Sequence, residues 1–181
     1  QNMLHTPAMT KEQTLQAIQV GIDLVAELKQ EGYRLIATGE MGIGNTTTSS
    51  AIASVLLKVP VEKVTGKGAG LSSDGLRHKV DVIEQTIKKH KPNCNDAIDV
   101  LSKVGGLDIA GMTGLFLGGA IHRVPVVIDG FVSGAAALLA VNICPKVQPY
   151  LIPSHVSKEP AAAMILEALR LKPLINCELC L

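Results

Sequence analysis

A glycine-rich stretch that contains one acid is the clearest chemical feature of the sequence. From Thr38 to Thr48 it reads Thr-Gly-Glu-Met-Gly-Ile-Gly-Asn-Thr-Thr-Thr, after the apolar run 35–37 and before an apolar-periodic segment at 49–57. A strand that passes through glycines into a helix presents backbone N–H groups and a helix N-terminus to one point, which suits a phosphate. Glu40 adds a carboxylate that a plain phosphate loop does not need. The stretch predicts a site where an anion is bound and an acid or base acts beside it.

Loops after other predicted strands are also polar or rich in glycine. In a parallel α/β sheet, ligands bind at the carboxyl ends of the strands, so residues that directly follow the strands are expected to meet. They are Glu40 and Gly42 after a strand at 33–37, Gly66 and Gly68 in the loop 66–70 after a strand at 61–65, Asp129 and Gly130 after a strand at 124–129, and 154–157, which ends in Ser157, after a strand at 147–153. The sequence predicts one composite site.

Helices are expected between these strands. A capping box, in which Thr10 is followed by Gln13, opens an amphipathic helix that ends near Gly32. Helical spacing of apolar residues predicts further helices at 49–57, from a Ser73 cap to about 90, and at 98–104, 107–121, 131–141 and 159–171. The repeated order of strand, loop and helix predicts an α/β fold: a doubly wound, Rossmann-like, mostly parallel sheet with helices on both faces, forming a single nucleotide-binding domain over 1–181.

Composition argues against several kinds of partner. The 181 residues are 47% hydrophobic and 18% charged, which suits one well-filled core. The net charge is +1, and two Tyr, two Phe and no Trp offer little for base stacking, so no nucleic acid is expected. No apolar run reaches the roughly 20 residues of a bilayer span. Four cysteines are few for a disulfide framework, and no signal-peptide pattern opens the chain. These features predict a cytoplasmic protein without a membrane segment.

A nucleoside-triphosphatase is one alternative for the first glycine loop. Gly39 and Gly44 have the separation of a Walker A loop, and Thr46 stands at its hydroxyl position. However, Asn45 occupies the position of the phosphate-binding lysine, and Glu40 places negative charge inside the loop. A nucleotide that carries a single phosphate fits these residues better than a triphosphate.

Two lysines are the candidate cations for such a phosphate. Lys67 lies within the second glycine loop, whereas Lys79 lies at the edge of the apolar stripe of the next helix, where a lysine is usually solvated.

A metal site would need more than Cys177 and Cys180, because one such pair without a second pair or a nearby His is a weak pattern. No metal and no cofactor is expected.

Four longer motifs together resemble one enzyme family. They are Gly39-Glu-Met-Gly-Ile-Gly-Asn-Thr-Thr47, Thr65-Gly-Lys-Gly-Ala-Gly70 with the downstream Lys79, Asp129-Gly-Phe-Val-Ser-Gly-Ala135, and Ser154-His-Val-Ser-Lys-Glu-Pro160. In this order they resemble the nicotinate-nucleotide:dimethylbenzimidazole phosphoribosyltransferases of cobalamin nucleotide-loop assembly, and the resemblance runs from about His5 to the last residues. It implies that the phosphoribosyl group of nicotinate mononucleotide passes to a nitrogen of dimethylbenzimidazole with inversion at the anomeric carbon, giving α-ribazole phosphate and nicotinate.

The resemblance also implies roles for single residues. Glu40 would lie beside the reacting centre and stabilise a cationic ribose. Gly42 and Gly130 would let backbone amides approach the nucleotide. Lys79 would contact the phosphate, in place of the solvated position that its helix pattern favours, and Ser157 would line the nucleotide pocket. The family further implies a homodimer.

Two departures from the family pattern are visible. Ser72 and Ser73 stand where the family commonly has acids. The family's general base is a glutamate in a Gly-Glu-Gly-Thr-Gly motif that follows a segment like 173–181, and the sequence stops before that motif; Glu178 belongs to the preceding segment. We therefore expect the central part of a longer enzyme, which alone binds nucleotide poorly and turns over little or nothing. The alternative is a truncated or degenerate, non-catalytic nucleotide-binding module.

Overall fold

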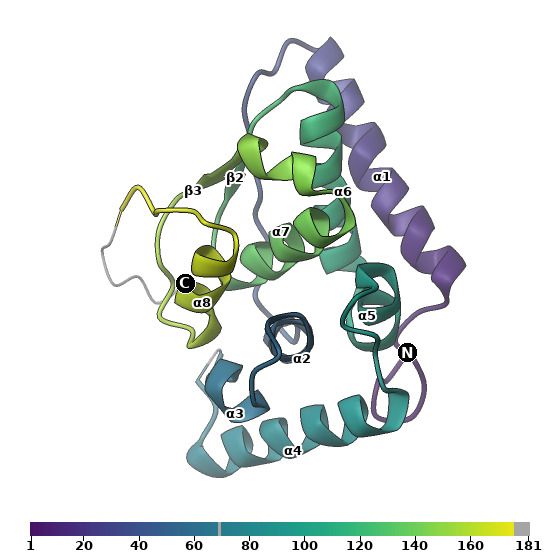
Figure 1. The fold of residues 1–181 in the computed structure, drawn as a ribbon, viewed down its shortest axis with the longest axis vertical. Coiled ribbons are helices and arrows are strands. Elements are labelled where there is room, and N and C mark those ends of the chain that lie inside the picture. The colour runs from purple at the N-terminus through teal and green to yellow at the C-terminus, as the bar shows by residue number, and fades with distance from the viewer. Residues whose placement is uncertain (69, 176–181) are drawn as a thin grey trace.

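The computed structural model describes residues 1–68 and 70–175, which are mostly helical, with a small sheet to one side of α6 and α7 (Figure 1). The helices are α1 (Lys11–Gln30), α2 (Thr46–Leu57), α3 (Val61–Val64), α4 (Ser73–His90), α5 (Ala97–Val104), α6 (Leu107–His122), α7 (Phe131–Ile143), the 3-10 helix η1 (Pro145–Tyr150) and α8 (Ala161–Ala168). The strands are β1 (Ile36–Ala37), β2 (Val126–Ile128) and β3 (Leu151–Pro153). Within the described ranges, no helix combines the length and apolar character needed to cross a membrane.

The strands form one parallel sheet in the order β1-β2-β3. Val126 in the central strand pairs with Ile36 on one side and with Leu151 on the other. Val126 and Ile128 are buried, as the strand predicted at 124–129, which carries no charge before its final Asp129, leads one to expect. Helices fill both connections, because parallel strands need a crossover. The predicted parallel α/β class is confirmed, although the sheet is smaller than expected.

The strand predicted at 61–65 is wrong, because Val61–Val64 form helix α3. Pro60 caps this helix with a φ of −54°, and the fixed φ of proline suits the entry into a helical turn. Val61 and Val64 are both buried, so the helical turn satisfies the hydrophobic pattern that also fits a strand. Residues 65–68 therefore reach the site from a helix, and the described sheet has three strands in place of four.

Strand β1 is shorter than the predicted strand at 33–37. Tyr33 and Leu35 are 54% and 55% exposed, and only Ile36 and Ala37 pair with β2. Apolar residues alone do not make a strand, because each strand also needs a neighbour for its backbone hydrogen bonds. The pairing places the end of β1 directly before the first glycine loop.

Capping residues set the helix starts. At α1, Thr10 Oγ1 accepts a hydrogen bond from Gln13 N at 3.1 Å, and Gln13 Oε1 accepts one from Thr10 N at 2.9 Å, so the predicted capping box is confirmed. The cap of α4 is Ser72 rather than the predicted Ser73, because it is Ser72 whose side chain accepts from Gly75 N. The start of α4 follows directly on the second glycine loop.

Helices α1 and α6 lie side by side (Figure 1). Glycines allow the close approach: a Cβ added at Gly21 would overlap Gly111 O, and one added at Gly114 would overlap Ile18 O. Backbone therefore packs directly on backbone, at a density that leaves no room for a methyl group. This contact fixes α6, whose first turn reaches the site described below.

Gly114→Ala is expected to lower the free energy of unfolding by about 2–3 kcal/mol, because the new methyl group overlaps the backbone of α1. Gly111→Ala, on the same helix, is the matched control. Its Cβ would lie 4.0 Å from the nearest atom, Ala17 O, so this change should be neutral or should stabilise the helix by up to about 1 kcal/mol. Urea denaturation measures both variants. Equal free energies of unfolding for the two would contradict this packing.

Candidate active site

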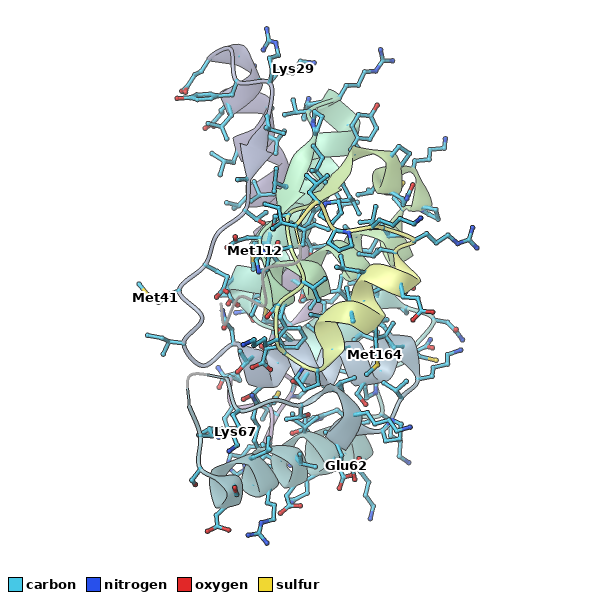
Figure 2. All side chains as sticks on the ribbon, turned by 90° about the vertical axis from the view of Figure 1, so that its left-hand side faces the viewer. Lys29, Met41, Glu62, Lys67, Met112 and Met164 are labelled. Atoms are coloured by element: carbon cyan, nitrogen blue, oxygen red, sulfur yellow. The ribbon has the colours of Figure 1, made fainter. Side chains whose placement is uncertain are left out.

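A cavity of about 870 Å³ lies at the carboxyl ends of the strands. Its walls come from the loop after β1, the loop between α3 and α4, the start of α7 after β2, and the loop between β3 and α8. Figure 2 labels Met41 and Lys67 on the first two of these loops, on the same side of the view. The predicted site residues that line the cavity are Glu40, Gly42, Gly66, Gly68, Asp129, Gly130 and Ser157. The structure thus brings together residues that lie far apart in the sequence.

The Glu40 carboxylate is held through one of its two oxygens. Oε2 accepts hydrogen bonds from Gly42 N and from Asn45 Nδ2, the latter at 2.6 Å. Gly42 and Gly44 adopt φ values of +73° and +81°, which are accessible to glycine without strain, and this turn brings the Gly42 N–H back to Glu40. No described residue donates a hydrogen bond to Oε1. This second oxygen is available to a ligand in the cavity.

The second glycine loop packs against the half-buried acid Glu159. Gly68 N donates a hydrogen bond to Glu159 Oε1 at 3.1 Å. Glu159 Oε2 is buried, has no hydrogen-bond partner among the described residues, and lies where a Cβ on Gly66 would overlap it. A side chain at position 66 would therefore displace Glu159. Glycine is required here by close approach.

Lys79 lies behind this loop and not in solvent. Its side chain is 6% exposed, and Nζ donates to Thr46 Oγ1 and to Gly66 O, each at 3.0 Å. The solvated position that the helix pattern favours is therefore wrong, since α2 and the loop 66–70 offer the ammonium its acceptors. Burial lowers the pKa of Lys79, and the nearby Glu159 carboxylate raises that pKa in part. Lys79 is not among the residues that line the cavity, and its ammonium has one N–H beyond these two bonds.

Helix N-termini add positive potential to the cavity. Thr46 at the start of α2 and Phe131 at the start of α7 both line the wall. The free N–H groups of a first helical turn and the helix dipole favour an anion. Gly130, which caps α7, has open space where a Cβ would project, so a ligand can approach its backbone.

Asp129 and Ser157 complete the predicted residues at the wall. The backbone N–H of Asp129 donates to Ser133 Oγ at 3.3 Å, which fixes the turn from β2 into α7. Ser157 is 4% exposed, and its Oγ accepts a hydrogen bond from Glu159 N at 3.3 Å. Both residues therefore have structural contacts at the cavity wall, and their roles towards a nucleotide stay predictions.

Sequence reasoning missed three important residues of this region. Glu159 stands inside one of the four motifs and directly before Pro160 at a helix start, and this was a usable signal. The sequence marks Asn45 only as the residue at the position of the Walker A lysine, and nothing in it indicates the bond from Asn45 to Glu40. Asp108, in the first turn of α6, also contacts Asn45. An acid in a first helical turn is usually explained by the helix dipole alone.

Metal ligands do not gather in the described ranges: no three His, Cys, Asp or Glu side chains there are placed to hold one ion. The pair Cys177 and Cys180 lies outside the described residues, as does Glu178. The cavity wall offers amide and ammonium groups, which suit a phosphate, together with the carboxylate of Glu40, which suits a developing positive charge.

The three-stranded parallel sheet, with glycine loops and helix N-termini around a cavity at its carboxyl edge, defines an α/β protein whose cavity is suited to an anion. A family model described as a phosphoribosyltransferase matches residues 1–181. The chain belongs to this phosphoribosyltransferase family, as its motifs predict.

Individual relatives and solved structures agree with this family. The chain is 53% and 51% identical, over 178 residues each, to the nicotinate-nucleotide–dimethylbenzimidazole phosphoribosyltransferases of Clostridium acetobutylicum and Ruminiclostridium cellulolyticum. Each alignment covers 98% of this chain and 51% of the relative. The crystal structure of CobT from Thermus thermophilus is similar with a TM-score of 0.94 and 37% identity, over 99% of this chain and 54% of that one. The chain spans about half the length of these relatives.

Proposed function

We propose that the full-length protein transfers the phosphoribosyl group of nicotinate mononucleotide to dimethylbenzimidazole, giving α-ribazole phosphate and nicotinate, in cobalamin biosynthesis. The observation that carries this proposal is the cavity itself, in which Glu40 faces the same space as an anion-binding glycine loop backed by Lys79. The names of the relatives that are about half identical to this chain support the choice of substrates.

The arrangement divides the substrate between two parts of the cavity. The phosphate binds at the loop 66–68, where Lys79 and the helix N-termini stabilise its charge. The anomeric carbon lies near Glu40, and Gly42, Gly130 and Ser157 contact the nucleotide between them. The bond from this carbon to the nicotinate nitrogen breaks, and its electron pair leaves with nicotinate. As ribose becomes cationic, the Glu40 carboxylate stabilises it.

The acceptor then completes the exchange. A dimethylbenzimidazole nitrogen attacks the opposite face of the anomeric carbon with its lone pair, and a base removes the proton from the other ring nitrogen. The family resemblance assigns that base to a glutamate motif after a segment like 173–181. The 181 residues alone therefore turn over little or nothing.

We further propose that the protein is cytoplasmic and forms a homodimer; the family resemblance implies this assembly.

Product analysis tests the proposal. The full-length protein is mixed with nicotinate mononucleotide and dimethylbenzimidazole, and α-ribazole phosphate and nicotinate are separated by chromatography; we expect both to form in equal amounts. A parallel reaction contains the 181 residues alone, from which we expect almost no product. Nucleotide binding by the full-length protein without product would favour a non-catalytic binding module. Hydrolysis of a magnesium-bound nucleoside triphosphate would instead favour a nucleoside-triphosphatase, the alternative for the first glycine loop.

A further inference from the structure

The side chain of Asn45 bridges two carboxylates. Its Nδ2 atom donates to Glu40 Oε2 at 2.6 Å and to Asp108 Oδ2 at 2.9 Å. An amide nitrogen carries two N–H bonds, so these two contacts use both of them. A neutral donor between two negative charges lets both carboxylates approach without a direct contact. The three side chains form a chain from α6 through the start of α2 to the first glycine loop.

We infer that Asp108 and Asn45 are positioning residues that fix the carboxylate of Glu40 for the reaction; this inference rests on the proposed function. Asp108 is the second residue of α6, and α6 is held by its glycine contacts with α1. Asn45 is the cap residue of α2. Asp108 orients the Asn45 amide, and the amide then holds Glu40 Oε2.

Glu40 needs this support because its surroundings are not rigid by themselves. Its side chain is exposed, and the loop turns through Gly42 and Gly44, whose backbone is intrinsically free. With Oε2 held by Asn45 and by Gly42 N, Oε1 is directed to the ligand. A small misplacement of a catalytic group lowers the rate without weakening the binding of the remaining substrate. Loss of the chain should therefore affect kcat and not KM.

Asp108→Ala in the full-length protein is expected to lower kcat about tenfold while KM for nicotinate mononucleotide changes by less than about twofold. Asp108→Asn, whose side-chain oxygen can still accept from Asn45, should recover most of the rate. Asp74→Ala is the matched control, because Asp74 is the second residue of α4 as Asp108 is of α6, and its ion pair is with exposed Arg77. This control should have wild-type kinetics.

A double-mutant cycle separates positioning from a general structural effect. In the Glu40→Ala background, Asp108→Ala should lower kcat no further, since the group that it positions is gone. Losses that multiply, or an Asp108→Ala variant as active as the Asp74 control, would overturn the inference while leaving the proposed function intact. Absence of α-ribazole phosphate from the wild-type full-length protein would overturn the proposed function, and this inference with it.

Discussion

Glu40→Gln in the full-length protein is expected to lower kcat for phosphoribosyl transfer by about 100- to 1,000-fold, because a preorganised charge at the reacting centre is worth that much in other enzymes. Glutamine keeps the size of the side chain and an oxygen that can accept from Gly42 N and Asn45, so the loop should keep its shape. Only the negative charge that stabilises the cationic ribose is lost. Binding of nicotinate mononucleotide should change by less than about threefold, because the positive charge lies on the pyridinium nitrogen in the ground state and moves onto the ribose beside Glu40 only as the glycosidic bond breaks.

Rapid-quench kinetics and calorimetry on the same variant separate these two effects. Glu84→Gln on the exposed side of α4 is the control, since it removes the same charge away from the cavity. If Glu40→Gln lost affinity and kept its rate, Glu40 would be a binding residue and the predicted catalytic role would be wrong.

Lys79→Met is expected to weaken the binding of nicotinate mononucleotide about 100-fold. Methionine fills a similar volume but removes the ammonium that backs the loop 66–68, and a charge-assisted contact with phosphate in a buried setting is worth about 2–3 kcal/mol. Calorimetric titration measures this change. Lys88→Met, an exposed lysine later in α4, is the control and should bind as the wild type does. Equal affinities of the two variants would show that Lys79 does not bind the phosphate.

The affinity should also depend on pH in a direction set by Lys79. Burial lowers the pKa of this ammonium, so it loses its proton at a lower pH than an exposed lysine does. The charged form binds phosphate, which means that affinity is complete below the lowered pKa and falls as the pH rises through it. The Lys79→Met variant should lack this decline. A wild-type affinity that stayed constant up to the ordinary pKa of lysine would contradict the proposed contact between the Lys79 ammonium and the phosphate.

The features that sequence could predict are those decided by neighbouring residues. The capping box of Thr10 and Gln13 is local, and the strand at Val126–Ile128 follows from three consecutive β-branched residues. The prediction failed where a short apolar segment fits two structures. Val61–Val64 became a helix because Pro60 favours that turn and both valines reach the core from it.

Long-range contacts account for most of what could not be predicted at the site. Lys79 is buried because Thr46 and Gly66, which lie on other elements, accept its hydrogen bonds. Asn45 and Asp108 are 63 residues apart, and no periodicity links them. By contrast, the meeting of the loops after β1, β2 and β3 at one edge follows from parallel strand order, which the sequence pattern does contain, whereas residues 66–68 reach this edge from α3.

A crystal structure of the full-length protein with nicotinate mononucleotide and no acceptor tests the central assignment most directly. The phosphate is predicted to lie within hydrogen-bond distance of Lys79 Nζ and the amides of Gly66 and Lys67, with the anomeric carbon facing Glu40 Oε1. A nucleotide bound outside this cavity, or inside it with the phosphate turned away from Lys79, would contradict the assignment of the cavity as the nucleotide side of a phosphoribosyltransferase active site.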